Sequence, residues 1–460
     1  MINLIKIIFV FWIQIPVVLQ AQAVTWQKWY DYNNYENDGE NVIQTFDGGF
    51  LILVNNYFPS NVSLLIKINL FGNIQWQRVL DHSVVNASSV RSYAVQQSRD
   101  SGYIIAGDSN GDSAFLLKTN KLGDSEWLKK YSRAGLAARF FDLKITMDGE
   151  IIACGDLFPP FNKGYIVKTD SLGVVFWDST YNTNAYKIIE TTDSNFYVLS
   201  SGLMKINSVG KRLWFTSFPA YMNSMVMDSS EYIYTAGSSD SVYLFKYDSS
   251  GTKVWDKRYF PGLLCFTMCI SKDQNILIAG ALDTLVQTDV GVVKVNKDGI
   301  QIFKKRIESV NGNWFKIPYS VKPTSDYGFI FTGLTDYPGF PYHDNVLAIK
   351  TDSMCYAPLK VGIDNEYTFV SDEFSLEQNT PNPFNPETTI KYELIKDGLV
   401  KIKVFDIMGR EITTLINENQ SSGKYKIHFN AETYNLSSGI YIYKLETSHK
   451  ATFKKMVFLK

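Results

Sequence analysis

The sequence predicts an all-β chain, with a seven-bladed β-propeller closed by its N-terminal strand and followed by a small Ig-like β-sandwich. Three observations support this prediction. A two-part motif recurs along most of the chain, a strand-like segment resembling its second part precedes the first copy, and residues 375–460 follow a different β pattern. The composition agrees, because aromatic residues, which fit pleated and half-buried surfaces, make up 15% of the 460 residues.

Residues 1–23 have the pattern of a signal peptide. Lys6 supplies a positive charge, and Ile7–Leu19 is a mostly apolar run that is too short to span a bilayer comfortably. Small residues stand at Ala21 and Ala23, as a cleavage site requires. We therefore expect cleavage before Val24, with a membrane anchor or a buried N-terminal helix as the alternatives.

The first part of the motif is a polar or glycine-containing turn followed by an apolar, β-branched or aromatic run, which is a strand signal. Another short strand-like run precedes each turn. The turn segments begin at Asp47, Asp100, Asp148, Asp193, Ser229, Asp273 and Ser325. Each copy therefore predicts two strands joined by a tight turn.

The second part of the motif predicts another hairpin. A third strand ends in Lys-x-Asn or Lys-x-Asp, a glycine makes the next turn, and an aromatic residue opens the fourth strand. The glycines, at which a positive φ costs little, are Gly72, Gly123, Gly173, Gly210, Gly251 and Gly299. The aromatic residues are Trp76, Trp127, Trp177, Trp214, Trp255 and Phe303. Four-stranded units at intervals of roughly 40–50 residues are typical of propeller blades.

The strand count predicts how the ring closes. The seventh copy, at Lys350, is not followed by a fourth strand, whereas Trp26–Tyr30 resembles the fourth strands but precedes the first unit. The simplest interpretation is that Trp26–Tyr30 completes the last blade, because this removes two open sheet edges. We expect the recurrent tryptophans to pack between blades. An extended β-solenoid is the competing fold.

The predicted propeller occupies residues 24–357 and resembles secreted propeller repeats of the Lys-x-Asp-x-x-Gly-x-x-x-Trp kind. Its hairpins alone also resemble those of quinoprotein and outer-membrane assembly propellers. Since the site pattern of the quinone enzymes is missing from the sequence, the resemblance implies no cofactor.

Residues 358–374 are a polar linker, and residues 375–460 form the predicted sandwich. Closely spaced prolines force an extended entry, and alternating strands follow. This part resembles the type A C-terminal sorting domain of the type IX secretion system, with a generic Ig-like adhesion module as the alternative. The matching residues include Asn379, Pro381, Asn382, Pro383, Phe384, Asn385, Pro386, Asp406, Gly409, Arg410, Gly423, Gly439, Tyr441 and Lys455.

The resemblance implies a route and a set of partners. The signal peptide would direct the chain across the inner membrane, and the type IX translocon and its sorting machinery would carry it across the outer membrane. Cleavage in the linker would then leave the propeller attached to surface lipopolysaccharide or released. We therefore expect a cell-surface or secreted protein.

Charge and cysteine content exclude other classes. The formal net charge is −1 and no long run of like charge appears, which argues against a nucleic-acid ligand, since that would need a basic face. The four cysteines, Cys154, Cys265, Cys269 and Cys355, do not have the spacing of a zinc site. We expect small buried side chains rather than a disulfide framework.

One face of the propeller is the candidate binding surface. Loops joining fourth to first strands share a face with loops joining second to third strands, and we call this the variable-loop face. Its loops are long and aromatic here, which suits glycan stacking or a protein anchor, although the side chains could simply pack together. The candidates are Tyr57, Phe58, Phe158, Phe161, Trp314, Phe315, Tyr337, Phe340, Tyr342 and His343.

Catalysis and metal binding have weaker support. No Gly-x-Ser-x-Gly or His-Glu-x-x-His motif is present, so we assign no catalytic residue. A hydrolase would need facing carboxylates, for which we single out Asp108, Asp112, Asp156, Asp240, Asp336 and Asp344. Asp108–Ser113 has the alternating oxygens of a calcium loop but lacks its usual glycine and glutamate. We expect a non-catalytic glycan- or protein-binding module, with a secreted polysaccharide hydrolase or lyase as the alternative.

Overall fold

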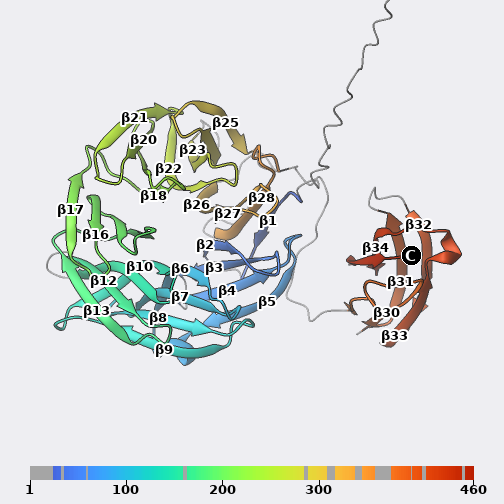
Figure 1. Ribbon diagram of the computed structural model, residues 1–460. Coiled ribbons are helices and arrows are strands. Elements are labelled where there is room, and N and C mark those ends of the chain that lie inside the picture. Colours follow the sequence, from blue (N-terminus) through green and yellow to red (C-terminus); the bar gives the residue numbers. More distant parts are fainter. Residues whose placement is uncertain are drawn as a thin grey trace, which may run out of the picture. The chain divides into compact units, whose positions relative to one another are not determined.

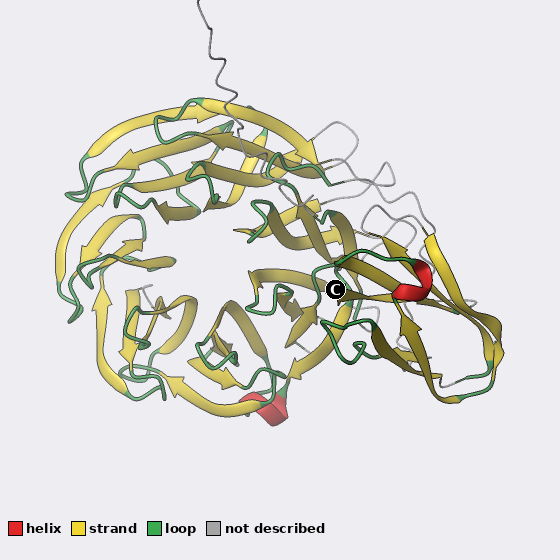
Figure 2. Ribbon diagram, turned by 45° about the vertical axis from the view of Figure 1, so that its right-hand side comes forward, coloured by secondary structure: helices red, strands yellow, loops and turns green. Residues whose placement is uncertain are grey.

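The computed structural model describes residues 24–32, 36–57, 61–158, 163–283, 288–307, 316–336, 344–357, 374–394, 396–406, 411–447 and 451–460. The chain divides into two compact units, Met1–Val361 and Gly362–Lys460. The expected signal peptide and nearly all of the expected linker lie outside the described residues. Strands dominate the described residues (Figure 2), whose helices are α1 (His82–Val85) and the 3-10 helix η1 (Glu432–Tyr434). None of the helices described is long and apolar enough to cross a membrane.

The first unit is a seven-bladed propeller in which each blade is a four-stranded antiparallel sheet (Figure 1). The first strand of each blade lies nearest the axis of the ring and the fourth lies at its outside. Blade 1 contains β2 (Asn37–Gln44), β3 (Phe50–Asn56), β4 (Val62–Ile68) and β5 (Ile74–Leu80). Blade 2 contains β6 (Val90–Gln97), β7 (Tyr103–Ser109), β8 (Ser113–Thr119) and β9 (Ser125–Tyr131). Blade 3 contains β10 (Ala137–Ile145), β11 (Ile151–Phe158), β12 (Lys163–Thr169) and β13 (Val175–Tyr181).

The remaining blades repeat this order. Blade 4 contains β14 (Lys187–Glu190), β15 (Phe196–Leu199), β16 (Gly202–Ile206) and β17 (Arg212–Ser217). Blade 5 contains β18 (Ser224–Met227), β19 (Ile233–Ser238), β20 (Val242–Tyr247) and β21 (Lys253–Tyr259). Blade 6 contains β22 (Leu263–Ile270), β23 (Ile276–Asp283), β24 (Thr288–Val295) and β25 (Gln301–Ile307). Blade 7 contains β26 (Lys316–Pro323), β27 (Phe329–Asp336), β28 (Asp344–Thr351) and β1 (Trp26–Tyr30).

The N-terminal strand closes the ring, as the sequence predicts. β1 pairs antiparallel with β28, with Trp26 opposite Lys350 and Tyr30 opposite Val346. Trp26 and Tyr30 are buried in a hydrophobic cluster that also contains Phe50 of blade 1. The closing strand therefore joins the last blade to the first by backbone pairing and by side-chain packing.

The recurrent glycine and tryptophan form the contact between neighbouring blades. A Cβ added at Gly123 would lie 2.8 Å from the ring of Trp76 in the preceding blade, and one at Gly72 would lie 3.0 Å from Trp26. These glycines also have positive φ, so both the turn and the packing require them. Tyr131 donates a hydrogen bond of 2.9 Å to the carbonyl oxygen of Gly173 in the next blade. The second part of the motif therefore packs neighbouring blades against each other.

The recurrent lysine has a different role inside its own blade. In six blades its ammonium group pairs with a carboxylate in or beside the first tight turn, at 2.6–3.7 Å. The pairs are Lys67–Asp47, Lys118–Asp100, Lys168–Glu150, Lys205–Asp193, Lys294–Asp273 and Lys350–Asp326. In blade 5, Lys246 lies 4.1 Å from the ring centroid of Tyr232 and donates to the carbonyl of Lys297. The lysine therefore ties the third strand to the first hairpin.

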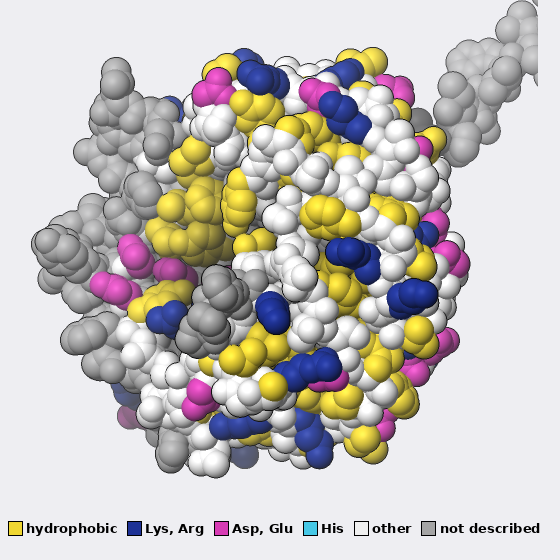
Figure 3. All heavy atoms as spheres, turned by 90° about the vertical axis from the view of Figure 1, so that its left-hand side faces the viewer, with side chains coloured by type: hydrophobic (Ala, Val, Ile, Leu, Met, Phe, Trp, Pro, Cys, Tyr) yellow, Lys and Arg dark blue, Asp and Glu magenta, His cyan; other side chains and the backbone are white. Residues whose placement is uncertain are grey.

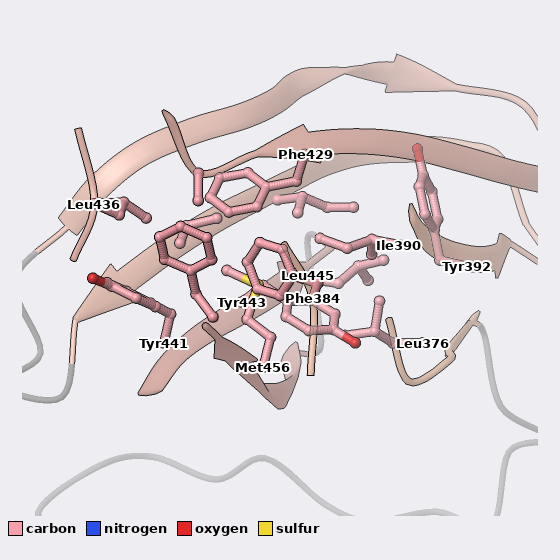
Figure 4. Close-up of a cluster of buried hydrophobic side chains, with 14 of the residues drawn as sticks. Leu376, Phe384, Ile390, Tyr392, Phe429, Leu436, Tyr441, Tyr443, Leu445 and Met456 are labelled. Carbon is pink, nitrogen blue, oxygen red and sulfur yellow. The ribbon is translucent and has the colours of Figure 1, made fainter. Parts of the chain in front are cut away.

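The second unit is a β-sandwich built from two antiparallel sheets. One sheet has the order β29 (Phe374–Leu376), β30 (Glu387–Leu394) and β33 (Gly423–Asn430). The other has the order β32 (Glu411–Gln420), β31 (Gly398–Asp406), β34 (Gly439–Glu446) and β35 (Ala451–Phe458). Side chains of both sheets meet in one core, which includes Phe384, Ile390, Phe429, Tyr443 and Met456 (Figure 4).

Candidate binding site around the propeller axis

Two of the ten aromatic or histidine residues singled out on the variable-loop face are described. Tyr57 directly follows β3, Phe158 ends β11, and both are half-buried. Phe58, Phe161, Trp314, Phe315, Tyr337, Phe340, Tyr342 and His343 lie outside the described residues. Of these ten residues, the structure therefore gives the positions of Tyr57 and Phe158 alone.

The structure also reveals a set of residues that the sequence analysis missed. In five of the seven innermost strands, a β-bulge interrupts the pairing with the second strand. A bulge leaves one residue unpaired and re-aims its side chain. The five bulge residues are Glu40, Tyr93, Phe141, Phe266 and Tyr319.

A sequence signal for these residues exists. Each lies five positions before the residue that opens the first tight turn of its blade, such as Ser98 for Tyr93. The same position in blades 4 and 5 holds Tyr186 and Asn223. Aromatic residues thus occupy the equivalent position in five of seven blades, namely Tyr93, Phe141, Tyr186, Phe266 and Tyr319.

Contacts between blades place these side chains around the axis. Ring centroids are 5.4 Å apart for Tyr93 and Phe141, 5.8 Å for Phe141 and Tyr186, and 6.4 Å for Tyr186 and Tyr221. The rings of Phe266 and Tyr319 are 5.9 Å apart. We call these six residues the axial ring. Each lies in the segment before an innermost strand or no later than the middle of that strand. This is the half of the strand nearer the variable-loop face.

Charged groups of blades 2 and 3 flank the axial ring. Arg139 donates two hydrogen bonds, of 3.0 and 3.1 Å, to the carboxylate of Asp156, and its guanidinium group lies 4.4 Å from the ring centroid of Phe158. Asp108 is 5% exposed. Burial raises the pKa of Asp108 to about 6, although the nearby charges of Arg91 and Arg139 oppose the shift. This sector offers both acidic and basic hydrogen-bonding groups.

Blade 1 contributes an acidic sector, which we define as Asp38 and Glu40. Burial raises the pKa of Asp38 to about 7, and repulsion from Asp344 and Glu40 adds to the shift. Burial also raises the pKa of Glu40 to about 7, while the charge of Lys187 in blade 4 acts in the opposite direction. Since blades 1 and 4 are not neighbours, the interaction of Glu40 with Lys187 crosses the axis.

Only some of the six carboxylates singled out from the sequence lie near one another or near the acidic sector. Asp108 and Asp156 come together beside Arg139, and Asp344 lies near Asp38. Asp240 instead accepts hydrogen bonds from Ser239 and Tyr243 in the loop of blade 5. Asp112 lies in the turn between β7 and β8, and Asp336 ends β27. Asp108–Ser113 spans the β7–β8 connection, and no group of three or more potential metal ligands occurs among the described residues.

The outer face of blades 3 and 4 offers no comparable arrangement. Hydrophobic side chains there lie among lysines, arginines and acidic residues (Figure 3). They include Phe176 of β13 and Leu213 of β17, which are 57% and 50% exposed. Scattered exposed apolar side chains are ordinary on soluble proteins. The four cysteines are buried and free.

The sorting-motif residues hydrogen-bond to and pack against β35, the last strand of the sandwich. Asn379 is buried, and its side-chain amide donates to the carbonyl of Pro381 at 3.0 Å and to the hydroxyl of Thr388 at 2.9 Å. The amide of Val457 in β35 donates to the side-chain oxygen of Asn382 at 2.8 Å. The ring centroids of Phe384 and Phe458 are 5.2 Å apart. This segment therefore covers the edge of β35 that β34 leaves open.

The other motif residues lie around this core. Pro381 and Pro383 follow cis peptide bonds, and Asn385 and Pro386 lead into β30. The carbonyl of Lys455 accepts a hydrogen bond from the side chain of Gln378 at 2.7 Å. Asp406 ends β31, Gly423 begins β33, Gly439 begins β34, and Tyr441 lies within β34. Gly409 and Arg410 lie outside the described residues.

The C-terminal unit matches a known family. Residues 380–459 match the family described as "Secretion system C-terminal sorting domain". The chain therefore ends in a sorting domain of the type IX secretion system, as the resemblance in the sequence indicates. No curated protein matches the chain.

Solved structures are similar to the first unit. The WD40 propeller domain of Doa1 aligns with a TM-score of 0.51 at 11% identity, covering 72% of this chain and 99% of that one. Virginiamycin B lyase from Staphylococcus aureus aligns at 0.49 and 10% identity, covering 71% and 99%. BamB from Moraxella catarrhalis aligns at 0.39 and 11%, covering 71% and 99%. At such identities the similarity extends to the propeller fold alone.

Proposed function

We propose that this protein is an exported glycan-binding propeller that acts without catalysis at the cell surface or beyond it. The sorting domain supports export through the type IX system. Residues 1–23 would serve as the signal peptide for the inner membrane. Cleavage within residues 358–374 would leave the propeller attached to surface lipopolysaccharide or free in the medium.

The axial ring is the observation that supports binding. Six aromatic side chains, four from innermost strands and two from the segments before β14 and β18, converge near the variable-loop face. They lie beside carboxyl and guanidinium groups. Aromatic faces that adjoin a few polar groups are typical of small-ligand sites. Sugars present both apolar ring faces and hydroxyl groups, so such a surface suits them.

A thermal-shift screen tests this proposal. Protein comprising Val24–Lys460 would be heated with each of a panel of polysaccharides, with and without calcium. A glycan present at 100 times its dissociation constant should stabilise the folded state by about 2.7 kcal/mol. Absence of any shift across the panel would contradict glycan binding.

The alternative is a secreted polysaccharide hydrolase or lyase. Its support is that Asp38 and Asp108 have carboxyl pKa values raised toward neutrality by burial, a property that general acids in enzymes share. Release of new sugar ends from a bound polysaccharide, lost in an Asp108→Asn variant, would favour this alternative. The binding proposal expects no such release.

A further inference from the structure

The axial ring is not continuous around the axis. In blade 5 the equivalent position holds Asn223, whose side chain donates to the carbonyl of Cys265 at 2.6 Å. Tyr221, two residues earlier, is 66% exposed and contacts Tyr186, so it supplies the ring at that point. In blade 1 the position holds Glu40, and the ring there gives way to the acidic sector.

The charged groups that act on Asp38 and Glu40 are mostly acidic. Asp38 is influenced by three neighbouring carboxylates, those of Asp344, Glu40 and Glu36. The phenol pKa of Tyr319 is raised by burial and then by Asp38 and Glu40, which places this end of the axial ring in the same negative field. Lys187 is the cation that acts on Glu40.

The arginines on the other side are already engaged. Arg139 forms its paired hydrogen bonds with Asp156 and lies against Phe141 and Phe158. Arg91 lies 5.5 Å from the ring centroid of Tyr57, and its charge acts on Asp108. Neither arginine offers an uncompensated positive charge to an acidic ligand, because each has a carboxylate nearby.

We propose that the axial ring binds a saccharide that carries no carboxylate or sulfate groups, and that Asp38 and Glu40 exclude acidic glycans from it. This inference rests on the proposed function and specifies the ligand class of the same site. Sugar rings would lie against Tyr93, Phe141, Tyr186 and Tyr221. Above about pH 7 Asp38 and Glu40 are ionised. An anionic sugar at the blade 1 end would then meet carboxylates of like charge, a juxtaposition that suppresses wrong partners.

Binding titrations on a defined panel test the inference. The probes are neutral hexasaccharides of glucose, mannose and xylose, and hexasaccharides of galacturonate and mannuronate. The protein is the chain from Val24 to Lys460, titrated well above pH 7 so that Asp38 and Glu40 are ionised. We expect at least one neutral probe to bind and both uronate probes to fail.

Four variants test whether the axial ring and the acidic sector, rather than exposed side chains elsewhere, determine binding. Tyr221→Ala and Tyr186→Ala should each weaken binding of the neutral probe by about tenfold or more, since each removes a stacking surface. Tyr356→Ala is the matched control, because Tyr356 is 62% exposed but follows β28 in the tight turn opposite the variable-loop face. The isosteric double variant Asp38→Asn, Glu40→Gln should gain measurable uronate binding.

The outcomes distinguish a failure of the preference for neutral glycans from a failure of glycan binding itself. Uronate binding to the unsubstituted protein at neutral-probe affinity would overturn the inference but leave glycan binding intact. So would neutral binding that Tyr221→Ala and Tyr186→Ala leave unchanged. Failure of every neutral and acidic probe would overturn both proposals.

Discussion

Removal of one carboxylate from a buried lysine pair should destabilise the propeller far more than removal of the whole pair. Lys350 is fully buried, and its ammonium group donates to both carboxylate oxygens of Asp326, at 2.8 and 3.0 Å, and to the carbonyl of Thr351 at 2.9 Å. Asp326→Asn retains the shape of the turn but removes the negative charge. The ammonium group would then be buried without a counter-charge.

The expected magnitude follows from the burial of the two groups. Breaking a buried pair typically costs about 3–5 kcal/mol. Asp326 keeps 26% of its side-chain surface exposed, so we expect about 2–3 kcal/mol for Asp326→Asn. The double variant Asp326→Asn, Lys350→Met removes both charges and should lie within about 1 kcal/mol of the unsubstituted protein.

Equilibrium urea unfolding, followed by tryptophan fluorescence, measures these differences. The pH dependence provides a second check. Burial lowers the pKa of Lys350, and Asp326 opposes this shift, so the pKa should fall further in Asp326→Asn. A lysine whose folded pKa lies below its unfolded pKa makes the protein more stable as pH rises between the two values. The deficit of Asp326→Asn should therefore shrink from pH 7 to pH 10. A loss of stability below about 0.5 kcal/mol at pH 7 would show that Lys350 does not need the charge of Asp326.

Three further predictions concern other parts of the chain. Trp26→Ala should destabilise the propeller by about 3–5 kcal/mol, as loss of a buried tryptophan does. Deletion of residues 25–31 should destabilise it at least as much. Unchanged midpoints of urea unfolding would contradict ring closure by this strand. Tyr443→Phe should cost the sorting domain about 1–3 kcal/mol, because its hydroxyl donates to the carbonyl of Glu377 and accepts from the amide of Asn379; equal melting temperatures would count against this role. The folded state holds the proton of Asp38 up to about pH 7, whereas the unfolded chain releases it near pH 4, so the stability contributed by this group falls as pH rises between these values. Asp38→Asn should flatten that fall in melting scans from pH 4 to pH 8, and parallel curves would disprove it.

The closure of the propeller ring could be predicted from the sequence because it depends on the number of strands in the repeated units. Seven copies of the lysine element and only six following strands leave a place that Trp26–Tyr30 fills. The partner of the lysine could not be predicted, since Lys350 and Asp326 lie 24 positions apart and their contact depends on how two hairpins pair.

The candidate binding site was harder to predict from the sequence. Sequence patterns for strands assume that side chains alternate between two faces, and the residues at Glu40, Tyr93 and Tyr319 lie on bulges that break this alternation. The sequence instead indicates aromatic residues in long loops, of which the structure describes Tyr57 and Phe158. The sorting motif showed an extended entry, but not that Asn382 binds the amide of Val457 in the last strand.

The most direct test of the account is the location of the propeller in cells that possess the type IX system. The full chain of 460 residues would be compared with a chain that stops at Ala357 and keeps residues 1–23, using protease added to intact cells and fractionation of the medium. We predict that the full chain delivers the propeller to the surface or the medium, and that the truncated chain remains in the periplasm. Equal delivery of both chains would contradict it.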